Sequence, residues 1–529
     1  MIKKIALLGV VSILLTQFTF AKSPTYYGVV IGCCGNYENG GIDALNAQAD
    51  ANMFYNKLVN LYYNGDRNRA NKNIDLLTEK RATKANIKNS LKKIAEKAQP
   101  EDIVYFFYSG HGSSLEDKSK IIAPSYKNNE LINVMTNSGL IVPYDFNLKK
   151  VFQTSIIGKR DLKDNGGYGF QYLDDNNVKV IMISDSCYSG NIYRTSKKSR
   201  TKFIPLSERN LEDEIKKQKI KLSRVKERSN YKHLIFFSAG GTDKAVAEDK
   251  RLHRGKFSLV IEKCLKTANQ NSDRKITKKE FAECLHTEDT AKAFVYYPVN
   301  RLSNATVFKS SSKNISVTQK DKIRVKTSIQ GLTNFSNQIV IDNKNYDIEI
   351  IQIGNSYQIF RYTGEEYALV EKQNIETYLN SLKLFKLKGR GKLKANVVNN
   401  SEKNVGRYCR GENVFVELQS QKNNILAITL DKEGKVIMIY PNDQRKPLSS
   451  SLEFKVQYPY GLDKIKIFSL ATNSQYNKVK KLIAPNGDLD ANYGVNKLYS
   501  ILKKNKNYKE IEIDIETLDK DKNYCKQGD

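Results

Sequence analysis

Two short turns contain the residues with the clearest capacity for chemistry. The stretch "YSGHGSS" (108–114) places His111, one of four histidines in 529 residues, between two glycines after an apolar run. The stretch "SDSCYSG" (184–190) places Cys187 in a small polar turn after a second apolar run. A cysteine attacks as its thiolate, and a neighbouring imidazole can take the thiol proton. If the two turns meet in space, they predict a Cys–His pair suited to acyl transfer.

Each residue also has a simpler structural interpretation. A lone cysteine after a strand is commonly a small core residue, and a lone histidine is commonly a hydrogen-bonded, half-buried side chain. The small residues around Cys187 favour catalysis, because they leave the sulfur open and free backbone N–H groups for a developing oxyanion. The other histidines are weaker candidates, since His233 begins a strand while His253 and His286 lie in charged, surface-like contexts.

The elements that must position these turns alternate between strands and helices up to about residue 308. Near-continuous apolar strands separated by amphipathic helices indicate a parallel sheet covered on both faces. Ligands bind outside the carboxyl ends of such strands, where both turns lie. The predicted strands are 26–31, 103–108, 178–183 and 234–238, and the predicted helices are 44–61, a helix capped by Thr83 and 257–268.

Beyond residue 309 the pattern changes to short alternating runs separated by turn residues. Stretches such as "SYQIFRYTGEEYALV" and the bend "DKEG" indicate β-hairpins. We therefore expect an α/β domain at 22–308, a β-rich linker domain at 309–389 and a β-rich C-terminal domain at 390–529.

The first residues have the pattern of a secretory signal. Two lysines precede an apolar run, 5–15, that is too short to span a bilayer comfortably, and 19–21 offers small residues for a signal peptidase. We expect 1–21 to be a removed signal peptide rather than an uncleaved anchor, which predicts a periplasmic or secreted protein. No transmembrane segment is expected in the rest of the chain.

Seven cysteines in an exported chain predict disulfides and at least one free thiol, because the number is odd. The sequence gives no connectivity, and Cys187 is the natural candidate for the free thiol. No C-x-x-C pair or His/Cys cluster supports a metal site.

A formal net charge of +30 could favour binding to nucleic acid, to an anionic membrane or to an acidic partner. The lysines, however, are spread along the whole chain and mixed with asparagine, without a concentrated basic arm. We interpret them as solvated surface residues and expect no nucleic-acid partner.

The ordered motifs resemble those of the caspase-like cysteine peptidases, most closely the metacaspase branch found in bacteria, plants and protozoa. The likeness spans about residues 25 to 308 and includes "YGVVIG", "YFFYSGHG", "LIVPYDF", "VIMISDSCYSG", "FSAGGTDKAVAED" and "RGKFSLVIEKCL". It implies a caspase-like α/β/α sandwich with a mostly parallel central sheet, followed here by β-rich C-terminal domains. The last block is similar to a small β-rich domain of unknown function, which implies a binding or localising role with an unknown partner.

The resemblance implies roles for residues of both turns. Cys187 would be the nucleophile, and His111 would protonate the leaving amine. The backbone amides of Gly112 and Cys187 would form the oxyanion hole.

The resemblance also implies an acidic specificity pocket formed by Asp50, Ser109 and Asp185. Two carboxylates in a partly dehydrated pocket select a guanidinium or ammonium, which predicts protein or peptide substrates with a basic P1 residue. Each carboxylate has an alternative interpretation: Asp50 as a helix N-cap, and Asp185 as a turn-stabilising residue.

Many metacaspases depend on calcium, but this chain departs from their pattern. The nearest counterpart of the calcium-binding stretch is "IIGKRDL" (156–162), where Lys159 and Arg160 replace the expected aspartates. Two cations cannot coordinate a hard dication, and the nearby Asp174 and Asp175 are one pair without further oxygen ligands. We expect no cofactor, with calcium as the disfavoured alternative.

The resulting hypothesis is an exported cysteine endopeptidase that cleaves after Arg or Lys. One alternative is a catalytically inactive caspase-fold scaffold or binding protein, in which the β domains carry the function. Another is a legumain-like or gingipain-like peptidase of different specificity, although legumains usually show Glu-Ala-Cys where this chain has Asp185-Ser186-Cys187.

The segment 191–232 separates the cysteine turn from the next core strand and is rich in Lys and Arg. Such a segment is typical of a proteolytic site, although 206–225 could instead form a solvated amphipathic helix. We expect self-cleavage after one of the basic residues at its start: Arg194, Lys197, Lys198, Arg200 or Lys202.

Overall fold

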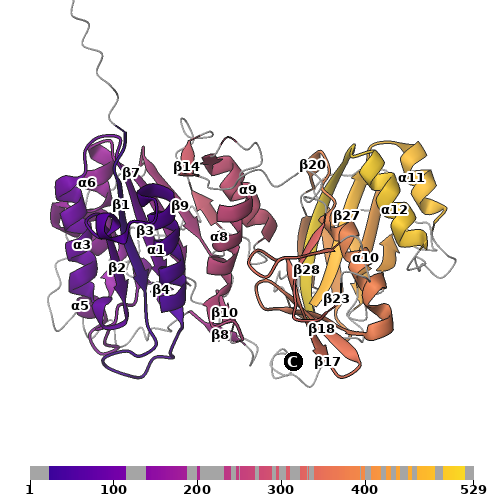
Figure 1. The fold of residues 1–529 in the computed structure, drawn as a ribbon, viewed down its shortest axis with the longest axis horizontal. Coiled ribbons are helices and arrows are strands. Elements are labelled where there is room, and N and C mark those ends of the chain that lie inside the picture. The colour runs from indigo at the N-terminus through magenta and orange to yellow at the C-terminus, as the bar shows by residue number, and fades with distance from the viewer. Residues whose placement is uncertain are drawn as a thin grey trace, which may run out of the picture.

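The computed structural model has an α/β part, drawn in indigo to magenta in Figure 1, and a β-rich part, drawn in orange to yellow. Among the described residues, no helix is both long and apolar enough to cross a membrane. The predicted signal peptide lies outside the described residues. These are 23–114, 139–186, 199–202, 231–239, 246–249, 251–268, 273, 275–288, 294–296, 305–309, 322–330, 332, 339–393, 395–399, 407–418, 424–430, 436–440, 451–455, 462–482 and 493–518.

A central sheet organises the α/β part, and within the described residues it has six strands in the order β13–β9–β7–β3–β1–β2. All pairs are parallel except β13 with β9 at one edge. The predicted sandwich with a mostly parallel sheet is therefore confirmed. The sequence did not predict β2 at the other edge, where only two of the five residues are buried. The strands are β1 (Tyr26–Gly32), β2 (Ile74–Thr78), β3 (Ile103–Ser109), β7 (Lys179–Asp185), β9 (Leu234–Ser238) and β13 (Phe294–Tyr296).

Helices cover both faces of this sheet (Figure 1). Successive strand residues point to opposite faces, so Phe106 belongs to a hydrophobic cluster with residues of α3 and α6, while Phe107 belongs to another with residues of α1, α8 and α9. The predicted cap is confirmed, since the Thr83 hydroxyl accepts a hydrogen bond from the Asn86 amide at 3.2 Å. The helices of this part are α1 (Ala47–Tyr63), α2 (Arg67–Ala70), α3 (Lys84–Lys97), α5 (Val151–Thr154), α6 (Phe170–Asp175), α8 (Lys256–Thr267) and α9 (Lys278–Glu288).

Short strands build two further small sheets around the predicted site. One contains β4 (Gly112–Ser114), β5 (Gly139–Ile141) and β6 (Ile156–Ile157). The other has the order β11–β10–β8, and its strands are β8 (Ser199–Thr201), β10 (Ala247–Asp249) and β11 (Arg254–Gly255). A separate pair joins β12 (Lys275–Thr277) to β14 (Thr306–Lys309).

Disulfides bear out the expectation that several cysteines pair. Cys264 in α8 is bonded to Cys284 in α9, with their Cα atoms 5.7 Å apart, which ties the two helices together. Cys33 and Cys34 are bonded to each other after β1, and Cys409 is also disulfide-bonded. Cys187 lies outside the described residues, so its state as a free thiol stays a prediction.

The β-rich part has one hydrophobic cluster that joins residues of 309–389 to residues of 390–529, with α10 (Ile375–Lys386), α11 (Asn473–Lys480) and α12 (Tyr493–Lys504) beside its sheets. The predicted domain boundaries stay predictions. The strands are β15 (Ile323–Lys326), β16 (Ile339–Ile341), β17 (Ile348–Ile353), β18 (Ser356–Arg361), β19 (Glu366–Glu371), β20 (Gly391–Lys392), β21 (Ala395–Asn399), β22 (Arg407–Cys409), β23 (Asn413–Leu418), β24 (Ile425–Leu430), β25 (Val436–Tyr440), β26 (Ser451–Lys455), β27 (Leu462–Leu470) and β28 (Tyr508–Leu518).

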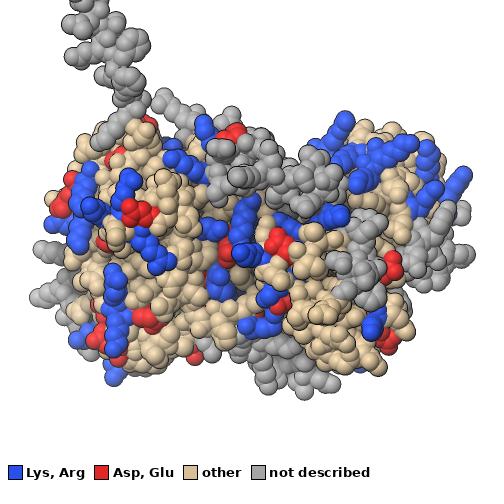
Figure 2. Space-filling view, in the orientation of Figure 1, with Lys and Arg blue, Asp and Glu red and all other residues tan. Residues whose placement is uncertain are grey.

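Ion pairs join the two parts beside α8. Lys263 of α8 lies 2.8 Å from Asp347, and the same carboxylate also pairs with Arg324 and Lys386 of the β-rich part. On the face drawn in Figure 2, Lys and Arg side chains lie among acidic ones over the α/β part, and they gather without acidic neighbours over α11 and α12.

Candidate active site

The carboxyl ends of β1, β3 and β7 lie side by side. Gly32, Ser109 and Asp185 are register neighbours across these three strands. His111 follows Ser109 by two residues, and Cys187 follows Asp185 by two residues. The two turns therefore begin at adjacent strand ends, while Cys187 itself lies outside the described residues.

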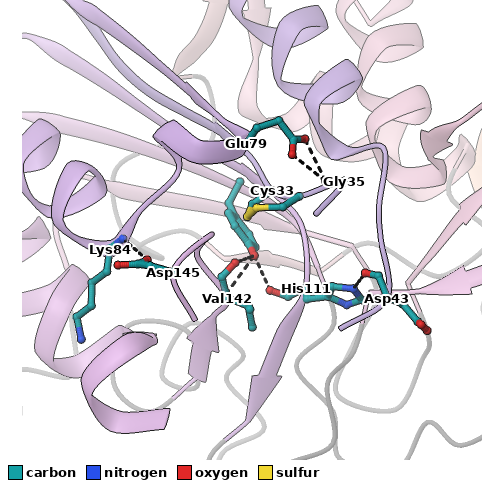
Figure 3. Close-up of a disulfide and its surroundings, with 10 residues drawn as sticks. Cys33, Gly35, Asp43, Glu79, Lys84, His111, Val142 and Asp145 are labelled. Carbon is teal, nitrogen blue, oxygen red and sulfur yellow. Dashed lines mark hydrogen bonds between the residues drawn. A yellow bond between two sulfur atoms is a disulfide. The ribbon is translucent and has the colours of Figure 1, made fainter. Parts of the chain in front are cut away.

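Backbone contacts fix the turn that carries His111 (Figure 3). The His111 carbonyl oxygen accepts hydrogen bonds from the Tyr108 hydroxyl and, at 3.1 Å, from the Val142 amide. Gly110 has no room for a side chain, because a Cβ there would lie 2.6 Å from the Cys33 carbonyl oxygen. These contacts hold the imidazole at the strand end.

The imidazole of His111 is an uncharged base with a free lone pair. Its Nε2 lies 2.8 Å from the Asp43 carbonyl oxygen, as Figure 3 shows. A carbonyl only accepts, so Nε2 carries the proton and Nδ1 is a bare acceptor. Nδ1 is buried and has no hydrogen-bond partner among the described residues. Burial lowers the pKa of His111 to about 4, against the effect of the Asp43 carbonyl, so the ring is neutral at pH 7.

The three residues predicted to form the pocket lie together. Asp50, Ser109 and Asp185 are all fully buried, and the Ser109 hydroxyl donates to Asp50 Oδ2 at 2.9 Å. The alternative interpretation of Asp50 as a helix cap is wrong, because α1 begins after Asn46 and Asp50 lies in its first turn. Burial, with the negative charge of Asp50, raises the pKa of Asp185.

The start of α8 completes the pocket with residues that the sequence reasoning did not assign. The Ser258 amide and hydroxyl donate to Asp185 Oδ2 at 3.1 and 2.5 Å. The Gly255 amide donates to Asp50 Oδ2 at 3.0 Å, and Arg254 Nε donates to Asp50 Oδ1 at 2.5 Å. A Cβ at Gly255 would overlap the Asp185 carboxylate, so glycine is required there. The motif "RGKFS" in the sequence contains these residues and could have identified them as part of the pocket.

A lysine of the chain itself occupies this pocket. Lys202 is fully buried, and its ammonium lies 2.9 Å from Asp185 Oδ2, 3.6 Å from Asp50 Oδ2 and 2.8 Å from the Ser109 hydroxyl. Burial acts to lower the pKa of Lys202, but the two carboxylates outweigh it and raise the pKa, so the side chain stays charged. The geometry shows that the pocket accommodates one extended basic side chain.

The backbone of Lys202 follows the edge of the same site. Its carbonyl oxygen accepts a hydrogen bond from the Gly112 amide at 2.9 Å, and its amide donates to the Val246 carbonyl at 3.1 Å. The preceding residues form β8, which pairs antiparallel with β10. A basic residue thus has its side chain in the pocket while its carbonyl meets the amide assigned to the oxyanion hole.

The stretch compared with the calcium-binding loop contains an ion cluster. Asp161 is buried, and its carboxylate pairs with Arg160 at 2.7 Å, Lys88 at 3.2 Å and Lys84 at 3.7 Å. Asp174 accepts hydrogen bonds from the backbone amides of Lys232 and His233, just before β9. No group of three or more acidic, His or Cys side chains that could hold a metal occurs among the described residues.

Residues 28–196 match the sequence model of the family described as metacaspase, peptidase C14 domain. This part of the chain is metacaspase-like. The match supports a cysteine-type peptidase that acts on proteins, and the resemblance expected from the sequence is confirmed.

Solved structures that match part of the chain include a protein from Geobacter sulfurreducens, which is 17% identical, with a TM-score of 0.37 over 54% of this chain and 99% of that chain. Caspase-1 from Spodoptera frugiperda is 9% identical, with a TM-score of 0.30 over 55% of this chain and 92% of that chain. No curated protein matches the sequence. The functional assignment therefore depends on the family match and on the geometry of the site.

Proposed function

We propose that this protein is an exported cysteine endopeptidase that cleaves after Arg or Lys, with Cys187 as nucleophile and His111 as its acid–base partner. The observation that carries the proposal is the charged side chain of Lys202, buried between Asp50 and Asp185 while its carbonyl oxygen meets the Gly112 amide. Export is inferred from the signal-like residues 1–21.

The acid–base chemistry follows from the state of His111. Its bare Nδ1 takes the proton of the Cys187 thiol, and the thiolate attacks the substrate carbonyl carbon. The resulting imidazolium is a strong acid, since burial lowers the pKa of His111 to about 4, and it gives its proton readily to the leaving amine. Water then hydrolyses the thioester and releases the acid product.

Stabilisation of the oxyanion falls to backbone amides. The Gly112 N–H donates to a carbonyl oxygen at 2.9 Å, the distance expected for a preorganised donor. The Cys187 amide is the second donor proposed.

Selectivity follows from the charge balance of the pocket. Asp50 has Arg254 as a permanent partner, whereas Asp185 has only the ammonium of Lys202 as a cation among the described residues. A buried carboxylate without a counter-charge is costly, so a substrate cation is favoured and a substrate aspartate is rejected. The second oxygen of Asp185 has no partner in the described part of the chain, which suits the several N–H groups of arginine.

The scaffold alternative is disfavoured by the same geometry. A silent fold has no need of a buried imidazole with a bare nitrogen beside a charged pocket, since an unsatisfied buried polar atom costs stability. The legumain-like alternative lacks support, because asparagine would leave the Asp185 charge uncompensated. We further propose that calcium is not required, since three cations neutralise Asp161.

Covalent labelling tests the proposal. A peptidyl acyloxymethyl ketone ending in Arg should alkylate the purified enzyme on Cys187, as located by peptide mass spectrometry. The Cys187→Ala variant and an otherwise identical reagent ending in Asp are the matched controls, and neither should give labelling. Labelling at another cysteine, or equal labelling by both reagents, would refute the proposal.

A further inference from the structure

The turn between β18 and β19 of the β-rich part lies directly against the β10–β11 hairpin of the α/β part. Gly364 is in this turn, at a φ of +92°, and a Cβ there would lie 2.2 Å from the carboxyl carbon of Asp249. Asp249 is the last residue of β10, and its carboxylate accepts hydrogen bonds from the amides of Arg251 at 3.0 Å and Leu252 at 2.8 Å. The β-rich part therefore meets the α/β part at the residues that lead through β11 into the pocket.

The same turn reaches the first residue of α8. Lys256 Nζ lies 2.7 Å from Glu365 Oε1. Burial acts to raise the pKa of Glu365, but the positive charges of Lys256 and Arg361 outweigh it and lower the pKa to about 2. The carboxylate is therefore ionised at pH 7, and a charged pair ties the start of α8 to the β-rich part.

The neighbours of Lys256 hold the two pocket carboxylates. The Gly255 amide donates to Asp50 Oδ2 at 3.0 Å, and the Ser258 amide donates to Asp185 Oδ2 at 3.1 Å. Amides at the start of a helix have no partner within the helix, so they are available to the pocket. Their positions depend on where the first turn of α8 is held, and Lys256 lies between them in the sequence.

Two further contacts hold the hairpin and the helix. The guanidinium of Arg251 pairs with Glu349 and lies 4.2 Å from the centroid of the Phe360 ring. Lys263, two turns along α8 from Lys256, lies 2.8 Å from Asp347. The β-rich part therefore holds the chain both before and after the pocket residues 254–258.

We infer that the β-rich part positions the specificity pocket of the α/β part, with Glu365 as the positioning residue that acts through Lys256. The pair holds the start of α8, and this keeps the amides of Gly255 and Ser258 within hydrogen-bond reach of the pocket carboxylates. The consequence for substrate selectivity rests on the proposed function, whereas the consequence for the α8 amides does not. The region 309–389 then serves the peptidase site directly instead of only connecting two domains.

A merely structural ion pair makes different predictions. If the pair only joined the two parts, its loss would lower the stability of the whole chain or leave it unchanged, and the pocket would recognise substrates as before. If the pair positions the pocket, its loss changes the start of α8 selectively and weakens the recognition of a basic side chain.

Amide hydrogen exchange of the purified protein tests the positioning directly. Glu365→Gln removes the charge that holds Lys256, so the amides of 255–258 should exchange at least about fivefold faster than in wild type. The amides of α3, which the pair does not contact, should exchange as in wild type. Glu371→Gln changes an exposed glutamate at the other end of β19 and is the matched control, which should leave both regions unchanged.

Two peptides that differ only in a P1 residue of Arg or its neutral analogue citrulline measure the recognition of charge. The ratio of their kcat/KM values, Arg over citrulline, should fall at least about fivefold in Glu365→Gln. Lys256→Gln should have the same effect, and the double variant should be no worse than either, because both changes remove one interaction. Lys256→Arg keeps the pair and should retain the wild-type ratio.

Unchanged exchange at 255–258 in Glu365→Gln, or equal acceleration in α3, overturns the inference. An Arg-to-citrulline ratio that Glu365→Gln does not change also overturns it, while the preference of wild type for Arg keeps the proposed function standing. A wild type without preference for the Arg peptide overturns the proposed function instead, and the exchange rates then decide whether the β-rich part positions these amides.

Discussion

The ammonium of Lys202 lies 2.9 Å from Asp185 Oδ2, and both side chains are fully buried. With Asp50 and its partner Arg254, the pocket contains two carboxylates and two cations, so its charges balance. Removing one member of such a buried set leaves an uncompensated charge, which costs far more than a surface ion pair contributes. The pocket is therefore built for the presence of a cation.

Loss of either dyad residue should abolish catalysis. Cys187→Ala and His111→Ala should each reduce peptide hydrolysis at least about a thousandfold, and the double variant should be little worse, because residues that act as a unit are not additive. Thermal unfolding of Cys187→Ala serves as the control for folding. Substantial turnover by Cys187→Ala would remove the nucleophile assignment.

Loss of a pocket carboxylate should weaken cleavage after Arg. Asp185→Asn and Asp50→Asn should each reduce kcat/KM for an Arg substrate about thirty-fold or more, since a buried charge pair loses one partner. Asp175→Asn changes an exposed carboxylate and is the matched control. Full activity in both pocket variants would contradict the acidic-pocket assignment.

The buried imidazole should make stability depend on pH. Burial lowers the pKa of His111 in the folded protein to about 4, while an unfolded histidine titrates near 6.5. The unfolded state therefore binds the proton first, and the contribution of His111 to stability, complete above about pH 6.5, is lost as the pH falls toward 4. The loss amounts to about 3 kcal/mol at most.

Denaturant unfolding of wild type and His111→Gln at several pH values measures this effect. The difference in unfolding free energy between the two proteins should change between pH 6.5 and 4 and should be constant above pH 7. A difference that does not vary with pH would show that the imidazole is not held neutral.

Calcium removal should leave hydrolysis largely unchanged. The carboxylate of Asp161, in the stretch compared with the calcium-binding loop, is already paired with Arg160, Lys84 and Lys88. Activity is measured in chelator and again after millimolar calcium is added. An enzyme that is inactive in chelator and becomes active when calcium is added would contradict this prediction. Asp174 and Asp175 would then be the candidate calcium ligands.

The strong local patterns of the chain allowed the fold around the site to be predicted. The runs that became β1, β3, β7 and β9 are nearly all apolar, as strands buried on both faces must be. The edge strand β2, in which only two of five residues are buried, has no such run and was not predicted. The strand register explains why the predicted site residues meet, because parallel pairing of β3 and β7 places Ser109 beside Asp185.

The pocket was only partly predictable, because half of it comes from elements distant in the sequence. Asp50, Ser109 and Asp185 follow from the family motifs, but the contacts of Arg254 and Ser258 depend on how the start of α8 meets the sheet edge. No local pattern distinguishes one basic residue of a long Lys- and Arg-rich segment from another. The position of Lys202 is decided by tertiary pairing of β8 with β10.

The central claim is that the site cuts after basic residues by cysteine chemistry. The most direct test uses four fluorogenic peptides that differ only in a P1 residue of Arg, Lys, Asn or Asp. Their hydrolysis is measured with wild type and with Cys187→Ala. The account predicts turnover of the Arg and Lys peptides by wild type, at least about thirty-fold above the Asn and Asp peptides, and none by the variant. Preferred cleavage after Asn or Asp, or equal turnover by Cys187→Ala, would contradict it.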